Sequence, residues 1–167
     1  SVISTLVAAL TPRLRINGPM RFFTDRERPA RLEDYSLSDL IWVDYEPSDA
    51  HALQPDQVQR INTDPDLTPK VARRLSSALE NALEDAADYG YTGQRFDRAS
   101  NEVRSVCRHA QDEYSGGFYP ITRVLVDLIA AADGATVRDY IVRWRRNPFL
   151  LLRRIAVHLC SLPAVEP

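Results

Sequence analysis

The sequence predicts a mainly α-helical fold, in which antiparallel helical hairpins form a repeat-like array or an irregular bundle behind an irregular N-terminal segment. Two observations carry this prediction. Apolar residues recur every three or four positions in successive segments, as on the buried face of an amphipathic helix. Proline and glycine interrupt that pattern at short intervals, so neighbouring helices should run antiparallel. We therefore divide the chain into residues 1–66, a helix followed by an irregular acidic segment, and residues 67–167, a helical-repeat-like domain.

The N-terminal part combines one helix with segments that lack a sustained period. Val2 to Leu10 has helical spacing of its apolar residues, and a helix at the very start suggests a segment cut from a longer polypeptide. Residues 11–31 contain three prolines and a glycine and are expected to be irregular. The stretch from Leu37 to Tyr45 is ambiguous, because it fits either a short helix capped by Ser38 or a strand that ends at Glu46–Pro47.

The helical signal becomes clear at Thr68. This residue as N-cap and Pro69 at the first helical position should begin a long helix, which Gly90 ends. A second apolar stripe starts at Phe96 and keeps the same period until Gly116–Gly117. The sequence therefore predicts a helical hairpin here.

Three more helices should follow. One begins after Pro120 and ends near Gly134, and the last two cover residues 135–147 and 148–162, joined by an Asn-Pro break. The centres of the apolar stripes are expected to be buried, and they are Leu75, Leu79, Leu83, Val103, Leu125, Leu128, Trp144, Ile155 and Leu159.

Two runs in the second half of the chain carry a resemblance to known proteins. They are FDRASNEVRSVCRHAQDEYSGGFYPITRVLVDLI and RWRRNPFLLLRRIAVHL, within Phe96 to Leu162. Together they resemble the HEAT-like helical repeats of large bacterial multidomain proteins, such as the C-terminal sensor or scaffold regions of STAND-type (NACHT-type) NTPases. Many of those proteins are linked to antiphage defence. The resemblance implies a HEAT-like array that acts as a scaffold or sensor, although the nucleotide-binding motifs of such NTPases do not occur in this sequence.

Composition points to a globular, cytoplasmic protein without a cofactor. The chain is 44% hydrophobic and 26% charged, it has no apolar run long enough to cross a membrane, and its first residues lack a basic leader. Cys107 and Cys160 fall on or beside apolar stripes, where an unpaired cysteine behaves as a small hydrophobic residue. We expect no disulfide framework.

Charge is distributed unevenly along the chain. Residues 25–56 contain nine acids against three arginines, whereas residues 134–162 contain six arginines against one aspartate. All but one of the 21 cationic side chains are arginines, the exception being Lys70. This preference fits coding bias in a GC-rich bacterial genome as well as selection for bidentate contacts with anions.

The arginine cluster near the C-terminus is the best candidate for an interaction site. Its members should surround Trp144, whose spacing places the indole in the core, and should point outward. They could be solvated, paired with acids, or bound to nucleic acid; overall acidity disfavours the last. The cluster comprises Arg143, Arg145, Arg146, Arg153 and Arg154.

A second candidate is aromatic. Tyr114, Phe118 and Tyr119 surround Gly116–Gly117 and could form a partner-binding edge. Alternatively, they close the loop over the helical hairpin by a hydrophobic contact.

Catalytic and metal sites are not supported by the residue spacing. His109, Asp112 and Glu113 are close in sequence, and His109 and Glu113 have the spacing of two ligands on one helical face. A third and a fourth ligand would have to come from elsewhere, for instance His51 or His158, so a solvated helix end is favoured. Cys107 and His109 are two positions apart and would face different sides of a helix. An acidic run matches no calcium loop and is expected to be a solvated surface; it consists of Glu33, Asp34, Asp39, Asp44 and Glu46.

The sequence therefore predicts a non-catalytic helical scaffold or sensor segment of a larger bacterial protein, which binds a protein partner or other domains of its own polypeptide. Two alternatives remain open: an accessory domain of an NTPase or effector enzyme, and an arginine-rich module that binds nucleic acid. An independent enzyme is the least supported reading, because no nucleophile, base or phosphate loop can be assembled from the sequence.

Overall fold

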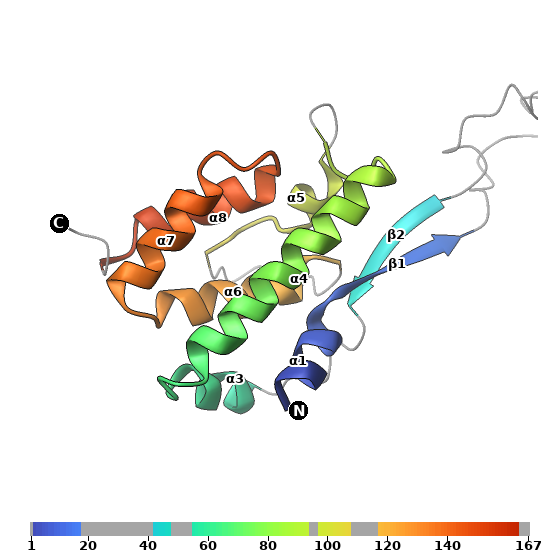
Figure 1. Cartoon of the computed structure of the whole chain (residues 1–167). Coiled ribbons are helices and arrows are strands. Elements are labelled where there is room, and N and C mark those ends of the chain that lie inside the picture. The colour runs from blue at the N-terminus through green and yellow to red at the C-terminus, as the bar shows by residue number, and fades with distance from the viewer. Residues whose placement is uncertain (1, 18–41, 48–54, 94–96, 108–116, 164–167) are drawn as a thin grey trace, which may run out of the picture.

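The computed structural model of the chain describes residues 2–17, 42–47, 55–93, 97–107 and 117–163. Within these residues the fold is mainly helical with one small two-stranded sheet, so the predicted fold class is confirmed (Figure 1). The elements in chain order are α1 (Val2–Leu10), β1 (Pro12–Asn17), β2 (Trp42–Pro47), α3 (Pro55–Asn62), α4 (Thr68–Asp88), α5 (Arg98–Glu102), α6 (Tyr119–Ala130), α7 (Gly134–Trp144) and α8 (Leu150–Cys160).

Helix α4 lies at the centre of the molecule, where it packs against α6, α1 and β1 (Figure 1). Leu67 is the N-cap of α4 and Thr68 is its first residue, so the predicted N-cap is wrong by one residue. The hydroxyl of Thr68 donates to the carbonyl oxygen of Ile61 in α3, 2.6 Å away. At the other end Gly90 adopts a φ of 69°, and its N–H donates to the carbonyl of Ala87. This left-handed glycine ends the helix as the sequence predicted.

The N-terminal elements differ in part from the prediction. Helix α1 forms as expected, but the segment after it is strand β1, which pairs antiparallel with β2. The strand reading of the ambiguous stretch before Pro47 is thus correct from Trp42 onward. The expectation of an irregular segment, based on the prolines and the glycine of residues 11–31, is wrong for β1, because β1 forms hydrogen bonds with a strand from a distant part of the chain. Leu6, Leu10 and Tyr45 belong to the same core cluster as the helices, so the N-terminal elements pack on the helical region.

The two closing helices form close to the predicted ranges, with α7 beginning one residue earlier at Gly134, and they pack against each other. Asp133 is the N-cap of α7, where its carboxylate accepts hydrogen bonds from the backbone N–H groups of Ala135 and Thr136. At the Asn-Pro break, the side-chain oxygen of Asn147 accepts a hydrogen bond from the N–H of Phe149. These contacts satisfy backbone donors that the start of a helix leaves without an intrahelical partner.

The second predicted helix is wrong at residues 103–107, which follow Glu102; its predicted end, residues 108–116, lies outside the described residues. The sequence extended it from Phe96 to near Gly116, but α5 has only five residues and Val103 leaves the helical conformation with φ of −89° and ψ of 78°. Val103 and Val106 are nevertheless buried, as their place in the apolar stripe predicted. The stripe correctly indicated burial of these side chains but not the backbone conformation that buries them.

The core agrees with the predicted helix phasing. Each stripe centre that the sequence places in the core has an exposed fraction of 0%, and these are Leu75, Leu79, Leu83, Val103, Leu125, Leu128, Trp144, Ile155 and Leu159.

Truncation of one central core residue should therefore be costly. We expect Leu79→Ala in α4 to lower the free energy of unfolding by about 2 to 5 kcal/mol, because it removes buried methyl groups and leaves a cavity. Val157→Ala in α8 is the control, since Val157 is 73% exposed and its truncation should change stability by less than about 0.5 kcal/mol. Urea unfolding followed by circular dichroism measures both. Similar losses for the two variants would contradict the assigned packing.

Candidate functional site

Arg143 and its neighbour Trp144 both contact Glu80 of α4. Arg143 forms an ion pair with Glu80, whose other carboxylate oxygen accepts a hydrogen bond of 2.6 Å from the indole N–H of Trp144. Trp144 is buried, as the sequence predicted. The carboxylate compensates the charge of Arg143, so this arginine holds α7 against α4 and adds little to a cationic surface.

Arg154 donates hydrogen bonds to backbone carbonyls of α5 and of the segment that follows it. One of its terminal nitrogens lies 2.9 Å from the hydroxyl of Ser100 and also donates to the carbonyl of that residue, and the other donates to the carbonyl of Arg104 at 2.9 Å. From α6, Arg123 donates to the carbonyl of Val106 at 2.7 Å. These guanidinium groups bind carbonyls that the early end of α5 leaves without helical donors. They are the physical reason why the segment after α5 can be ordered without being a helix.

Among the described residues, no carboxylate compensates the positive charge of the remaining cluster residues. Arg153 donates to the carbonyl oxygens of Asn147 and Pro148 at 3.0 and 3.1 Å, and carbonyls carry no net charge. Arg145 and Arg146 are exposed, and among the described residues neither is ion-paired with an acid. The cluster is thus partly structural and partly a cationic surface.

A surface groove of about 760 Å³ lies between α8 and the segment after α5. Leu150 and Val157 contribute exposed apolar surface to it, with exposed fractions of 40% and 73%. None of the described residues that line the groove is acidic, so its potential is positive. The cations of the lining, which we call the groove arginines, are Arg104, Arg145, Arg153 and Arg154.

A cysteine and a histidine meet inside this groove. The Sγ atom of Cys107 lies 3.1 Å from Nδ1 of His158, and the thiol is exposed. Burial lowers the pKa of His158 and the charge of Arg123 lowers it further, while Asp127 acts in the opposite direction. The imidazole is therefore neutral near pH 7 and can accept a proton. Cys107 and Cys160 are both exposed, so the prediction that they act as small hydrophobic residues is wrong.

The aromatic candidates do not form an exposed edge in the described part of the chain. Phe118 is 0% exposed and contacts the rings of Tyr45 and Tyr91, which agrees with the alternative of a hydrophobic contact. Tyr119 is half-buried, with the guanidinium of Arg123 5.9 Å from its ring centroid. Tyr114 lies outside the described residues.

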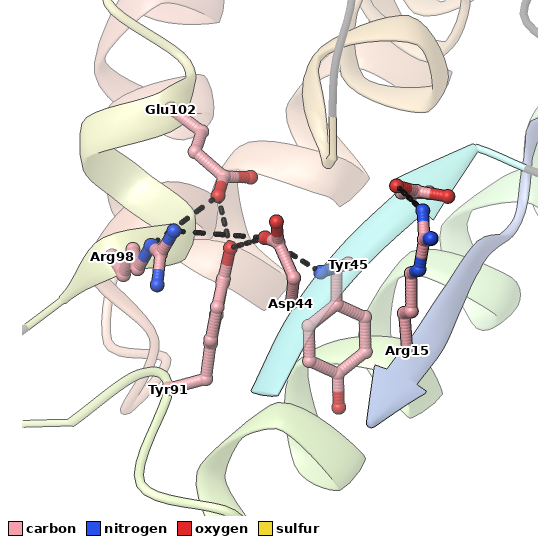
Figure 2. A network of polar contacts seen from close by, with 7 residues as sticks. Arg15, Asp44, Tyr45, Tyr91, Arg98 and Glu102 are labelled. Atoms are coloured by element: carbon pink, nitrogen blue, oxygen red, sulfur yellow. Dashed lines mark hydrogen bonds and ion pairs between the residues drawn. The ribbon is translucent and has the colours of Figure 1, made fainter. Parts of the chain in front are cut away.

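A polar network joins β2, Tyr91 and α5 (Figure 2). The hydroxyl of Tyr91 lies between the carboxyl groups of Glu102 and Asp44, with 3.0 Å to the latter. Arg98 extends its guanidinium toward both acids, at 3.8 and 3.7 Å. Gly117, with a φ of 55°, sits so close that a Cβ atom there would overlap the Glu102 carboxyl group.

The network contains fewer protons than its contacts require when both acids are ionised. A tyrosine hydroxyl donates one hydrogen bond, yet it contacts two carboxyl groups. Burial raises the pKa of Glu102, assisted by the charge of Asp44 and opposed by hydrogen bonds from Tyr91 and the Phe118 N–H and by Arg98. A protonated Glu102 that donates to Tyr91, which in turn donates to Asp44, satisfies both contacts.

Several predicted candidates lie outside the described residues or have structural partners. His51, His109, Asp112 and Glu113 fall outside, as do the first three members of the acidic run, Glu33, Asp34 and Asp39. Asp44 belongs to the network, and Glu46 is paired with Arg15 across the strands at 2.6 Å. In the part of the chain that the structure describes, no three His, Cys, Asp or Glu side chains gather as a metal site.

Three features of the candidate site were not predicted from the sequence. The first is the contact between Cys107 and His158, which are 51 positions apart in the sequence. From the sequence, His158 was considered only as a distant metal ligand, and Cys107 was compared only with His109. The second is Arg104, which forms a wall of the groove. The third is the role of Tyr91 and Glu102 in the polar network. A local pattern could not reveal these contacts, since each depends on how separate elements pack.

Comparisons with known proteins give limited context. No protein-family model matches the chain, and no solved structure matches it significantly. One curated relative, the uncharacterized protein y4cA of Sinorhizobium fredii, is 27% identical over 168 residues, which covers 99% of this chain. The chain spans 14% of that relative's length. Among the described helices, none combines the length and apolar character needed to cross a membrane.

Loss of the Arg154 contacts should loosen the segment after α5. We expect Arg154→Ala to lower the free energy of unfolding by about 1.5 to 3 kcal/mol, because hydrogen bonds from a charged, half-buried donor are lost and carbonyls lose their partners. Arg146→Ala, at an exposed position, is the matched control and should have little effect. Hydrogen exchange should also increase at residues 103–107. An equal effect of the two substitutions would refute the structural role of Arg154.

Glu102 should make stability depend on pH. Because its raised pKa lets the folded protein hold a proton that the unfolded chain has released, the free energy of unfolding falls as pH rises above the ordinary value of 4.5. Glu102→Gln removes this titration, so the variant should gain stability relative to wild type as pH rises above 4.5, until Glu102 is ionised in the folded protein as well, by about 1.4 kcal/mol per unit of pKa shift.

Denaturant unfolding at several pH values measures this difference. Glu84→Gln, at an exposed position of α4, controls for the loss of one carboxylate. A difference between wild type and Glu102→Gln that stays constant over the whole range would show that folding does not raise the pKa of Glu102.

Proposed function

We propose that this chain is a non-catalytic interaction segment of a longer polypeptide, and that its groove binds an acidic protein segment. The single observation that carries the proposal is the lining of the groove. It combines the groove arginines and the exposed apolar side chains of Leu150 and Val157, without an acid among the described lining residues. Arginine and apolar anchors are typical of protein-binding surfaces, and charge complementarity selects an acidic occupant.

The hydrogen bonds of two groove arginines support a role in binding a ligand, as opposed to a role as freely solvated surface charges. Arg153 and Arg154 are fixed by backbone carbonyls, which hold the guanidinium groups in place and leave their charge intact. A side chain that is already fixed loses less conformational entropy when a ligand carboxylate binds. The volume of about 760 Å³ is enough for several side chains of an extended segment.

The relative supports a role inside a larger protein. This chain aligns with 14% of that protein's length, so similar sequence occurs within a much longer polypeptide. Such an arrangement, together with the resemblance to HEAT-like repeats of bacterial multidomain proteins, favours a scaffold or sensor segment. In the accessory-domain form of the proposal, the acidic occupant is another domain of the same polypeptide.

Binding of short labelled peptides tests the proposal. Fluorescence anisotropy at physiological salt compares a peptide of alternating glutamate and leucine with versions that carry glutamine or lysine in place of glutamate. Arg104→Glu with Arg145→Glu reverses charge on both sides of the groove, at exposed positions. Arg74→Glu with Arg138→Glu makes the same change in charge at exposed positions outside the groove lining and is the matched control.

We expect the acidic peptide to bind wild type and the control variant, and to bind the groove variant about tenfold more weakly, because rim charges contribute roughly 0.2 to 1 kcal/mol per pair and reversal adds repulsion. Equal binding of the glutamate and glutamine peptides would refute recognition by charge. Micromolar or tighter binding of single- or double-stranded oligonucleotides, lost in the groove variant and steeply reduced by salt, would favour the nucleic-acid alternative instead.

A further inference from the structure

The groove contains a pair of groups that peptide docking does not require. Cys107 and His158 come from segments 51 positions apart, and the 3.1 Å contact between Sγ and Nδ1 joins a nucleophile to a base. The thiol is exposed and lies in the lining of the groove. A cysteine that is accessible, close to an imidazole and surrounded by cations has the environment of a reactive thiol.

We propose that Cys107 is a modification site that forms a mixed disulfide with small anionic disulfides of the glutathione class, with His158 as the base. The proposal depends on the cysteine–histidine pair and on the charge of the groove. It does not depend on the binding of an acidic protein segment.

The exchange reaction is balanced without a further reactant. As the thiol proton moves to Nδ1 of His158, the sulfur of Cys107 attacks one sulfur of the small disulfide. A new S–S bond forms, the old one breaks, and the other half leaves as a thiolate. Cys107 and one half of the disulfide are then joined in the mixed disulfide, and the released thiolate is the reduced product. His158 returns its proton to that thiolate or to water.

The groove selects an anionic partner. A glutathione-class disulfide carries carboxylates on both halves, and an arginine guanidinium binds a carboxylate through two parallel hydrogen bonds. The groove arginines supply four such groups, and no described lining residue is acidic. A volume of about 760 Å³ falls within the range of small-molecule sites, which is about 300 to 1,000 Å³.

The surroundings of His158 keep it able to accept a proton. From α6, Arg123 lowers the pKa of the imidazole and Asp127 raises it, with burial as the larger effect in the downward direction. At neutral pH the ring is thus a base whose Nδ1 faces the thiol.

Cys160 provides an internal comparison. It is exposed and lines the same groove, so it experiences the same cationic surroundings. Among the described residues, however, no histidine contact is found for its thiol, whereas Cys107 has one. The two cysteines therefore separate the contribution of the histidine from that of the groove charge.

The test uses single-thiol proteins. Cys160→Ser leaves only Cys107, and Cys107→Ser leaves only Cys160. Each reacts with three disulfides: the dianion dithiobis(nitrobenzoate), neutral dithiodipyridine and the dication cystamine. Every rate is divided by the rate of the same reagent with mercaptoethanol, a small neutral thiol, which removes the intrinsic reactivity of the reagent. The wild-type protein, which has both thiols, is exposed to glutathione disulfide, and intact and peptide mass spectrometry then locate the adduct.

We expect the protein that retains Cys107 to prefer the dianion over the dication by about tenfold or more at low salt, because an oppositely charged cleft raises encounter rates. Added salt should reduce this preference, as should Arg104→Glu with Arg145→Glu. His158→Asn keeps a hydrogen-bond acceptor near the Nδ1 position but cannot take up a proton, and it should slow the reaction with all three disulfides. Cys107 should also react faster than Cys160, and the glutathione adduct should lie on Cys107.

Three results would each overturn the proposal. The first is a Cys107 reaction that shows the same normalised rate for the anionic and the cationic disulfide. The second is an unchanged rate in His158→Asn, which would make the histidine a bystander. The third is a glutathione adduct on Cys160 alone. Because no peptide enters these measurements, a failure of acidic-peptide binding leaves their interpretation unchanged, and circular dichroism verifies that each variant is folded.

Discussion

The arrangement of the groove depends on the hydrogen bonds that Arg154 makes from α8 to the segment after α5. Its guanidinium binds the carbonyls of Ser100 and Arg104, so this segment is held against α8 at a fixed distance. That placement brings Cys107 beside His158 and sets one wall of the groove. One side chain therefore satisfies backbone groups, orders an irregular segment and assembles the only thiol–imidazole contact found among the described residues.

Helix α5 takes part both in the contacts that shape this groove and in the polar network around Tyr91. Ser100 of α5 accepts from Arg154, while Glu102 two residues later contacts Tyr91 and reaches Asp44 of β2 through it. A five-residue helix is too short to be stable alone, so its position is set by these contacts. The network contact of Glu102 and the Arg154 contact at Ser100 both hold α5 in place. A change that weakens the network should therefore also alter the position of the segment that carries Cys107.

The sequence predicted the parts of the fold that depend on local periodicity. Stripe centres such as Leu79 and Trp144 are buried because a helix with period 3.6 must place them on one face. Where tertiary contacts decide, prediction was incomplete: β1 needs a strand from a distant part of the chain, and residues after Glu102 take arginine donors in place of a helical ladder. For the candidate site, the sequence indicated the arginines but not their partners, and the cysteine–histidine pair follows only from packing.

The bonding of each arginine decides what its charge can do, which composition alone could not indicate. Arg143 faces a carboxylate, so its charge is compensated, whereas Arg153 and Arg154 face carbonyls and remain cations of defined orientation. A guanidinium can both bind the backbone and bind an anion, because it has five N–H donors: some donate to carbonyl oxygens while the others remain available to a ligand. A lysine at these positions would have a point charge and three donors without a fixed plane. The same residues therefore stabilise the fold and give the groove its preference for anions.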